Sequence, residues 1–307
     1  GATMVRPLVG AVGDGHGDGV VVAEPTDDFG IAIGIGVNPW YGILDAERMA
    51  LAAVDEALRN VVAVGADPDN TALLDNFSWG DPRRETTLGE LAAAVDGCVA
   101  GAHAFAAPFV SGKDSLNNEY LGSDGERHSV PPTLVITAVA HVPNANRTVT
   151  ADLKTAGNTL ILVGRTLSEF GGSHAAMVCN AHSTCVPTFD EQSPANYRAV
   201  HALMLQQKIR ACHDCSEGGL AVTVAEMAMA GRLGAALRPN PEVHAHLFSE
   251  SLGRLVLEVE AAHVSDVLAA IPGAHIIGSV TTTPFLVLPD NSALSIEAML
   301  NVWQAPQ

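Results

Sequence analysis

Polar side chains of several kinds crowd into one short stretch, residues 108–120, which reads P-F-V-S-G-K-D-S-L-N-N-E-Y. Its apolar start ends at Gly112, after which Lys113, Asp114 and Ser115 bring an ammonium group, a carboxylate and a hydroxyl. A buried strand that delivers such a turn can form an anion site, because glycine lets backbone N–H groups approach a ligand closely. The stretch therefore predicts either a phosphate site or an ordinary polar turn after a strand.

The same stretch departs from the Walker A phosphate loop at two positions. Ala107 stands where that motif, G-x-x-x-x-G-K-[ST], has its first glycine, and Asp114 stands where a Ser or Thr would hold magnesium. A phosphate site here would therefore need a loop of another kind.

Alternating strands and helices in the first half of the chain would position these side chains. Asp75 and Asn76 fall at the end of one expected strand, where open α/β sheets place their ligands, although such a pair also commonly starts a turn. We expect strands at residues 20–24, 31–37, 69–77 and 132–142, and helices at residues 45–60 and 87–106.

A polar, turn-rich segment at residues 144–157 predicts a boundary between two domains, which we place at residues 1–146 and 155–307. The second domain is expected to be α+β. Its expected strands are residues 159–163, 235–238, 254–258, 276–280 and 285–288, and its expected helices are residues 194–210, 220–230, 264–270 and 295–303.

Two glycine-rich segments leave a choice between binding and packing. Residues 10–19 could hold a phosphate through backbone N–H groups or form a mobile entry segment. Gly218 and Gly219 precede an expected helix, whose free N–H groups favour an anion, but such a pair also permits close packing. Residues 38–42 predict a rigid, aromatic loop of the kind that borders binding sites.

The composition narrows the class of protein. The chain has 307 residues, 48% of them hydrophobic, which is enough for a sizeable core in each of two domains. With 16 basic and 34 acidic residues the formal net charge is −18, which argues against nucleic acid and anionic membranes as partners. No apolar run reaches the length of a membrane span, and we expect a cytoplasmic protein.

The cysteines and histidines carry little chemistry of their own. Five cysteines form no disulfide framework and suggest a reducing compartment. Cys212 and Cys215 form a C-x-x-C pair that could bind zinc, act in redox chemistry, or lie in a structural turn before a helix. His103 falls in a helical pattern and His213 in a turn, and we interpret both as structural.

Four blocks of sequence, in the same order, carry a resemblance to a known family. The chain resembles the second half of the phosphoribosylformylglycinamidine synthases, which belong to the AIR-synthetase-like superfamily. The blocks are V-D-E-A-L-R-N-V-V-A-V-G-A-D-P at residues 54–68, L-D-N-F-S-W-G-D-P at residues 74–82, S-G-K-D-S-L-N-N-E at residues 111–119, and H-D-C-S-E-G-G-L-A at residues 213–221.

The resemblance implies a fold and a reaction. The fold is an AIR-synthetase-like module with an N-terminal α/β domain, whose sheet forms half of a barrel, and a C-terminal α+β domain. The reaction is that of a ligase of purine biosynthesis, which uses ATP and Mg²⁺ to convert formylglycinamide ribonucleotide and glutamine-derived ammonia into the amidine. The implied partners are the first half of the synthase and a glutaminase, and an isolated module is expected to form a homodimer.

The resemblance also implies site residues, position by position. Asp75 and Gly112 match positions that contact ATP, and Ser115 matches a serine that contacts the ribonucleotide. Lys113 replaces an asparagine that binds magnesium in the family. An ammonium group cannot ligate a cation but can pair with phosphate, so Lys113 is assigned to the nucleotide site and Asp114 becomes the substitute metal ligand.

One departure limits what this chain can do alone. The first half of the synthases carries its catalytic histidines in E-x-H-N-H-P and E-H-C motifs, and neither motif occurs in this sequence. We therefore expect no catalytic residue in this chain and no complete reaction without the missing half. Two alternatives stay open: a non-catalytic module that keeps a nucleotide as a scaffold, and another AIR-synthetase-like ligase or kinase.

Overall fold

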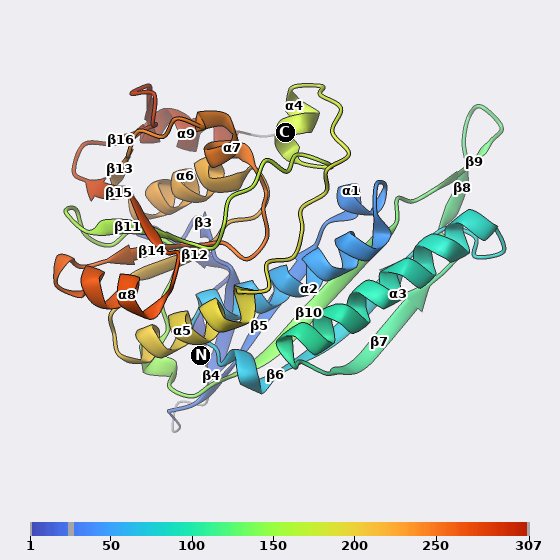
Figure 1. The fold of residues 1–307 in the computed structure, drawn as a ribbon, viewed down its shortest axis with the longest axis horizontal. Helices are drawn as coiled ribbons and strands as arrows, with labels where there is room; N and C mark the ends of the chain where they lie inside the picture. Colours follow the sequence, from blue (N-terminus) through green and yellow to red (C-terminus); the bar gives the residue numbers. More distant parts are fainter. Residues whose placement is uncertain (1, 24–27, 306–307) are drawn as a thin grey trace.

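The computed structural model describes residues 2–23 and 28–305, and two sheets organise it (Figure 1). We call the parts built on these sheets the N-terminal and C-terminal domains. The first sheet has six strands in the order β1-β4-β5-β10-β6-β7. These strands are β1 (Thr3–Val5), β4 (Gly19–Ala23), β5 (Gly30–Val37), β6 (Thr71–Ser78), β7 (Phe109–Ser115) and β10 (Thr133–Val142).

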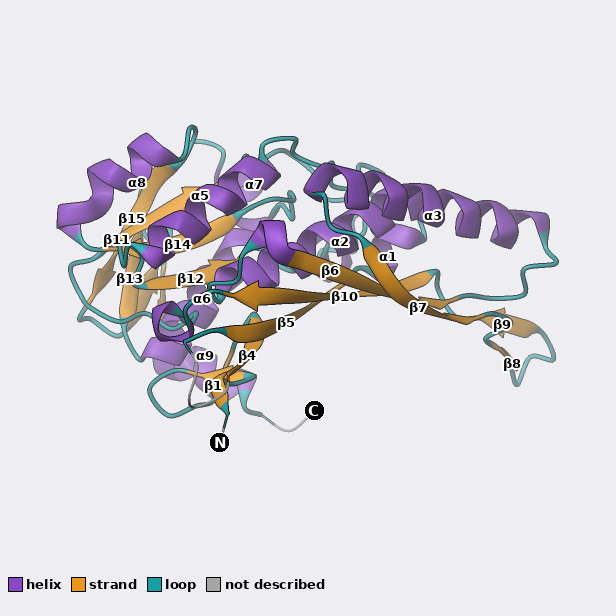
Figure 2. Ribbon diagram, turned by 90° about the horizontal axis from the view of Figure 1, so that it is seen from below, coloured by secondary structure: helices purple, strands orange, loops and turns teal. Residues whose placement is uncertain are grey.

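Two long helices, α2 (Ala46–Ala63) and α3 (Glu85–Phe105), cover one face of the first sheet (Figure 2). Neighbouring strands are antiparallel except β6 and β7, which are parallel. Parallel neighbours need a crossover connection, and α3 supplies it. Helix α2 makes a second crossover, because β5 and β6 both pair antiparallel with β10 and therefore run parallel to each other. These two crossovers give the domain its predicted α/β character.

Helix α2 is the central element of the molecule and is buried along almost its whole length. Asp45 caps its N-terminus by accepting a hydrogen bond from the Arg48 backbone N–H at 3.0 Å. The helix lies close to its neighbours because glycines face it: a Cβ on Gly36 of β5 or Gly97 of α3 would overlap the α2 backbone. Polar side chains on α2 are therefore removed from water.

The opposite face of the first sheet carries exposed apolar side chains. Along β5 buried and exposed residues alternate, and the exposed ones include Ile31, Ile33 and Ile35, beside Val22 of β4. Figure 2 shows α2 and α3 on one side of this sheet and no described helix on the other. An apolar sheet face of this kind is typical of a surface that another chain or domain covers.

The second sheet has seven strands in the order β12-β14-β11-β15-β13-β16-β17. Helix α6 packs against it, and the two sheets share a hydrophobic core through α2 and α5. The strands are β11 (Thr159–Val163), β12 (Ala211–Asp214), β13 (Gly234–Leu237), β14 (Leu255–Val259), β15 (His275–Thr281), β16 (Phe285–Val287) and β17 (Ala293–Ser295). The helices are α4 (His174–Val178), α5 (Ser193–Leu205), α6 (Gly219–Gly231), α7 (Val243–Phe248), α8 (Val264–Ala270) and α9 (Ile296–Trp303).

Short elements complete the chain. A hairpin of β8 and β9 projects from the end of the first sheet (Figure 1). Between the domains, the connection from β10 to β11 contains the 3₁₀ helix η2. These elements are β2 (Leu8–Val9), β3 (Gly15–His16), β8 (Glu119–Leu121), β9 (Arg127–Ser129), α1 (Pro39–Gly42), η1 (Pro68–Asn70), η2 (Ala145–Arg147) and η3 (Ala261–His263).

The expected strands and helices are confirmed, with shifts at their ends, and three local expectations are wrong. Residues 38–42 form the short helix α1 instead of a loop, because Pro39 fits the first turn of a helix. The helix expected at residues 194–210 ends at Leu205, since Gln207 has a positive φ of 57°. The C-x-x-C segment forms strand β12, paired with β14, instead of a turn. Residues 24–27, where an expected strand ends, lie outside the described residues.

In the part of the chain that the structure describes, no helix combines the length and the apolar character that crossing a membrane requires.

Candidate functional site

The five residues that the sequence assigns to a ligand site lie together on β6 and β7. Asp75 of β6 stands opposite Gly112 of β7, and Lys113, Asp114 and Ser115 follow along the same strand. We call these five residues the β6–β7 edge. Strand β7 is the last strand of the sheet, and the Lys113 and Asp114 side chains are exposed. The structure thus brings the assigned residues together, on an open surface.

The expected turn at Ser111 and Gly112 is wrong, because β7 runs straight through both residues. The glycine has a different local role. A Cβ at Gly112 would overlap the Asp75 carboxylate, so the glycine makes room for that side chain on the neighbouring strand. Gly112 is required here by Asp75, and its backbone forms no anion-binding loop.

The charges of the β6–β7 edge act on one another. Burial raises the pKa of Asp75, the Lys113 backbone N–H opposes that shift, and the negative charge of Asp114 raises it further. Along β7 the Lys113 ammonium donates a hydrogen bond to the Ser115 hydroxyl. Two carboxylates that repel each other fit a divalent cation, since Mg²⁺ is usually bound by one or two carboxylates together with substrate phosphates.

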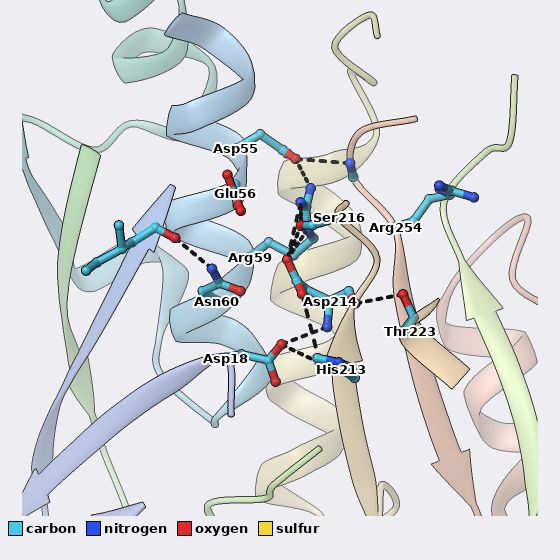
Figure 3. A network of polar contacts seen from close by, with 12 residues as sticks. Asp18, Asp55, Glu56, Arg59, Asn60, His213, Asp214, Ser216, Thr223 and Arg254 are labelled. Carbon is cyan, nitrogen blue, oxygen red and sulfur yellow. Dashed lines mark hydrogen bonds and ion pairs between the residues drawn. The ribbon is translucent and has the colours of Figure 1, made fainter. Parts of the chain in front are cut away.

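A second group of polar side chains lies between the two domains (Figure 3). All its members are buried or nearly so, and they come from the segment before β4, from α2 and from β12 with the turn after it. We call this group the interdomain cluster: Asp18, Asp55, Glu56, Arg59, Asn60, His213, Asp214 and Ser216.

Arg59 ties the interdomain cluster together. Its guanidinium pairs with Asp55 one turn earlier on α2, and it reaches Asp214 Oδ2 at 3.4 Å and Ser216 Oγ at 2.7 Å in the C-terminal domain. Asp55 in turn accepts hydrogen bonds from the Tyr197 hydroxyl at 2.7 Å and the Gly253 N–H at 3.0 Å. Burial works to lower the pKa of Arg59, but the surrounding carboxylates raise it well above its usual range. The guanidinium is therefore a fixed positive charge between the domains.

His213 joins Asp18 to Glu226. Its Nδ1 lies 2.7 Å from Asp18 Oδ1 and its Nε2 lies 3.0 Å from Glu226 Oε2, while the Asp214 N–H donates to Asp18 Oδ1 at 3.0 Å. Burial works to lower the pKa of His213, but Asp18 and Glu226 raise it well above its usual range. A protonated ring with both nitrogens bonded to carboxylates has no lone pair for a cation, which is in line with the prediction that His213 is structural.

Two oxygen atoms of the interdomain cluster lack partners. Asp18 Oδ2 and Asn60 Oδ1 are buried and accept no hydrogen bond from the described residues. Ligand atoms of Asp18, His213 and Asp214 all lie within 4.8 Å of one another. Carboxylate and amide oxygens are the ligands that Mg²⁺ and Ca²⁺ prefer, and unpaired buried oxygens are rare in proteins. The donor set therefore fits a hard divalent cation.

Two pockets adjoin the interdomain cluster. One, of about 300 Å³, is lined by Asp214 and Ser216, and the other, of about 470 Å³, by Asn38 and Tyr41. Both are also lined by His174 and Glu217, so the two pockets are neighbours, and the larger one is lined by residues of both domains.

A buried carboxylate lies behind the larger pocket, bonded to two of its lining residues. The buried carboxylate of Glu56 accepts hydrogen bonds from the Val37 N–H at 2.9 Å and from Asn38 Nδ2 at 2.7 Å. Burial raises the pKa of Glu56, and the charges of Glu217 and Asp214 raise it further. The carboxylates of Glu56, Glu217 and Asp214 therefore gather negative charge beside the two pockets, and a cation would neutralise part of it.

Gly218 and Gly219, at the start of α6, allow close packing and bind a carboxylate of the protein itself. The Gly218 N–H donates to Glu250 Oε1 at 2.8 Å, so a protein carboxylate already lies at this helix end. A Cβ on Gly219 would lie 2.5 Å from the Ser249 carbonyl oxygen, which leaves room for glycine alone. Residues 10–19 likewise pack on α6, where a Cβ on Gly15 would overlap Ala230, and they deliver Asp18 to the interdomain cluster.

Sequence reasoning missed most of the interdomain cluster. One local signal was present: Asp55, Glu56, Arg59 and Asn60 place four polar side chains at helical spacing within an otherwise apolar helix. Nothing local connects them to Asp18 or Asp214, which are far away in the sequence. Of the two histidines interpreted as structural, His103 lies exposed near the end of α3.

Comparisons with known proteins identify the family of both domains. Residues 14–142 match the family described as AIR synthase related protein, N-terminal domain, and residues 155–289 match the one described as AIR synthase related protein, C-terminal domain. The phosphoribosylformylglycinamidine synthase subunit PurL of Synechococcus elongatus is 35% identical over 297 residues, covering 90% of this chain and 36% of that protein.

Solved structures show the same fold. T. maritima PurL complexed with FGAR has a TM-score of 0.74 at 18% identity, covering 96% of this chain and 49% of that chain. T. maritima PurL complexed with ATP has a TM-score of 0.70 at 17% identity, covering 96% of this chain and 48% of that chain. The chain spans about a third of the curated relative and about half of the solved chains. It belongs to the AIR synthase related family and contains both of that family's domains.

Proposed function

We propose that this chain is the second half of a phosphoribosylformylglycinamidine synthase, an ATP-dependent C–N ligase of purine biosynthesis that works in the cytoplasm. The observation that carries the proposal is the β6–β7 edge, where Asp75 faces Gly112 and Lys113, Asp114 and Ser115 follow in register. The sequence similarity to a PurL subunit over 90% of the chain supports the same reaction.

Each residue of the β6–β7 edge has a role in this proposal. In the reaction, ATP phosphorylates the amide oxygen of formylglycinamide ribonucleotide, and ammonia then displaces the phosphate. Asp75 and Gly112 border the nucleotide, Lys113 pairs with a phosphate group, and the Ser115 hydroxyl binds the ribonucleotide. Asp114 would hold Mg²⁺, which supplies positive charge to the transferring phosphoryl group when bound.

The exposure of the β6–β7 edge is explained if another module completes it. Strand β7 ends the sheet, and the face with Ile31, Ile33 and Ile35 is uncovered. T. maritima PurLQS, a further similar structure, has a TM-score of 0.71 at 18% identity, covering 96% of this chain and 47% of that chain. We infer that the first half of the synthase covers this face, with a glutaminase supplying ammonia, and that a second copy covers it when the chain is isolated.

A separate observation supports a second role, as a module that keeps a nucleotide bound without turnover. The interdomain cluster lies within one chain, and its unpaired Asp18 Oδ2 and Asn60 Oδ1 fit a divalent cation. Asp18, Asn60 and Asp214 would hold Mg²⁺, and the cation would bind the phosphates, because the Arg59 guanidinium is already bonded to Asp214 and Ser216. We propose that a nucleotide bound here stabilises the contact between the domains.

Reconstitution tests the ligase proposal. The chain is mixed with a first half and a glutaminase, and amidine formation from formylglycinamide ribonucleotide, glutamine and ATP is followed. We expect activity that requires all three proteins and falls at least about 100-fold in Asp75→Ala, because a side chain that borders the nucleotide is lost. Absence of amidine formation with the wild-type chain would refute the proposal.

The nucleotide content of the purified protein separates the two roles. Nucleotide that stays bound through purification, and is not hydrolysed when the other subunits turn over, supports the scaffold role of the interdomain cluster. Protein that is free of nucleotide and gains none on incubation with ATP and Mg²⁺ would contradict that role.

A further inference from the structure

A small pocket at the connection between the domains concentrates positive charge in a strongly acidic protein. It has a volume of about 280 Å³ and lies between the connection after β10, the end of α5 and the residues that lead into β12. Among its lining residues are Arg147, Lys154 and Arg210, three of the 16 basic residues of the chain. No acidic residue of the described chain is among those that line it, although the sequence has 34.

Lys154 contributes charge to this pocket but has no free donor. Its ammonium group donates to Thr150 Oγ1 at 2.6 Å and to the Asp152 carbonyl oxygen at 2.8 Å, and it lies 2.5 Å from Asp152 Oδ1. Its backbone N–H is bonded to Glu258. Burial lowers the pKa of Lys154, and the positive charge of Arg210 acts in the same direction. Lys154 and Arg210 therefore feel each other's charge.

The two arginines are better placed to bind a ligand. Arg210 Nε lies 3.4 Å from Glu260 Oε1, and both side chains are about half exposed, at 48% and 49%. An exposed pair of this kind contributes little, and it leaves the terminal N–H groups of the guanidinium available. For Arg147 the described residues provide no ion-pair partner within 4.0 Å.

We propose that this pocket binds a phosphate group, either inorganic phosphate or a small phosphate ester. Phosphate at neutral pH carries about −1.5 to −2 charges, so it can satisfy two arginines, whereas a single carboxylate cannot. Guanidinium groups bind phosphate oxygens through paired N–H donors. Asn146 also lines the pocket, and its side chain carries an amide N–H₂ that can donate to a phosphate oxygen. Neither the β6–β7 edge nor the interdomain cluster shares a residue with this pocket.

Calorimetry without Mg²⁺ and at low salt tests the proposal. Inorganic phosphate and ribose 5-phosphate are titrated into the wild-type chain and into Arg147→Ala, Arg210→Ala and the matched control Arg198→Ala. Arg198 is an exposed arginine on α5 that pairs with Asp69 outside the pocket. We expect wild-type and Arg198→Ala to bind equally and each pocket variant to bind about tenfold more weakly or worse. The ligand that binds more tightly shows whether the pocket prefers inorganic phosphate or a phosphate ester. Ribose without phosphate is expected to give no binding heat.

A second measurement needs no variant. Since the second ionisation of a phosphate ester lies near pH 6, affinity of the wild-type chain is expected to rise between pH 5.5 and 7.5. The phosphate titration is then repeated with saturating ATP and Mg²⁺. If the pocket is independent of the nucleotide sites, its affinity for phosphate stays the same. The phosphate proposal can therefore hold even if the nucleotide proposals fail. Absence of phosphate binding, wild-type affinity in both pocket variants, or loss of phosphate binding in the presence of ATP would overturn the proposal.

Discussion

The β6–β7 edge and the interdomain cluster gather similar side chains in opposite surroundings. At the edge, Lys113 and Asp114 project from the last strand of a sheet into solvent. In the cluster, Asp55 and Arg59 are 0% and 2% exposed and are held by groups from both domains. The same charges are thus available to another molecule in one region and committed to the fold in the other.

The difference in burial decides whether a charged side chain is free to bind a ligand or contributes to the stability of the fold. An exposed charge loses little hydration and adds little to folding, whereas a buried charge must be paired or it destabilises the protein. The cluster leaves Asp18 Oδ2 and Asn60 Oδ1 unpaired in spite of this requirement. In our proposals a second surface completes the edge, and a cation completes the cluster.

The largest expected effect is that of Arg59→Met. The substitution removes the positive charge shared by Asp55 and Asp214, and leaving buried carboxylates unpaired costs about 3–5 kcal/mol of unfolding free energy. The matched change at the edge, Lys113→Met, is expected to stay within about 0.5 kcal/mol. Urea unfolding measures both. Equal losses in the two variants would remove the distinction between the regions.

Gly112→Ala is expected to cost about 1–3 kcal/mol, because its Cβ would overlap the Asp75 carboxylate and push it away from the Lys113 backbone N–H. The test is a double-mutant cycle in which the same substitution is made in an Asp75→Ala background. There the space is free, and most of the loss should disappear. An undiminished loss in the double mutant would mean that Gly112 serves the backbone and not its neighbour.

Stability is expected to fall as the pH rises above neutrality. The raised pKa of His213 means that the folded state keeps a proton which the unfolded chain releases above about pH 6.5, so the stabilisation is complete below that pH. It is lost as the pH rises toward the folded pKa, at up to about 1.4 kcal/mol per pH unit.

His213→Gln provides the control for this pH dependence. The variant is expected to be less stable than the wild type at pH 6 and to show a flatter decline between pH 6.5 and 8, measured by urea unfolding at several pH values. Parallel declines in the two proteins would show that His213 does not carry the titration.

The smallest effect is that of Mg²⁺ on the free chain. At about ten times its dissociation constant, a bound cation adds about 1.4 kcal/mol to the unfolding free energy. Thermal unfolding is expected to show this gain in the wild type and in Asp114→Asn, and to lose it in Asp18→Asn. The reverse pattern would place the cation at the β6–β7 edge.

Sequence patterns predict the parts of this fold that local spacing determines. Helix α2 was predictable because Asp45 caps it and apolar residues recur at helical spacing, and β5 because buried and exposed residues alternate. Strand β7 was only half predictable. Its Ser-Gly pair is typical of a turn, and it is extended because it pairs with β6, which is far away in the sequence.

The two candidate regions also differ in how far the local sequence predicts them. The β6–β7 edge could be predicted because most of its residues are consecutive and resemble a family motif. The interdomain cluster could not, because Asp18 and Arg59 meet Asp214 only after the two domains pack together. Long-range packing leaves no local pattern apart from the polar residues of α2.

One titration tests most directly whether the interdomain cluster binds a nucleotide by itself while the β6–β7 edge needs another module. ATP with Mg²⁺ is titrated by calorimetry into the wild type, Asp75→Ala and Asp214→Asn, after thermal unfolding has verified that all three are folded. We predict that Asp75→Ala binds like the wild type and that Asp214→Asn binds at least about tenfold more weakly. Binding that is lost in Asp75→Ala and kept in Asp214→Asn would contradict this division between the two regions.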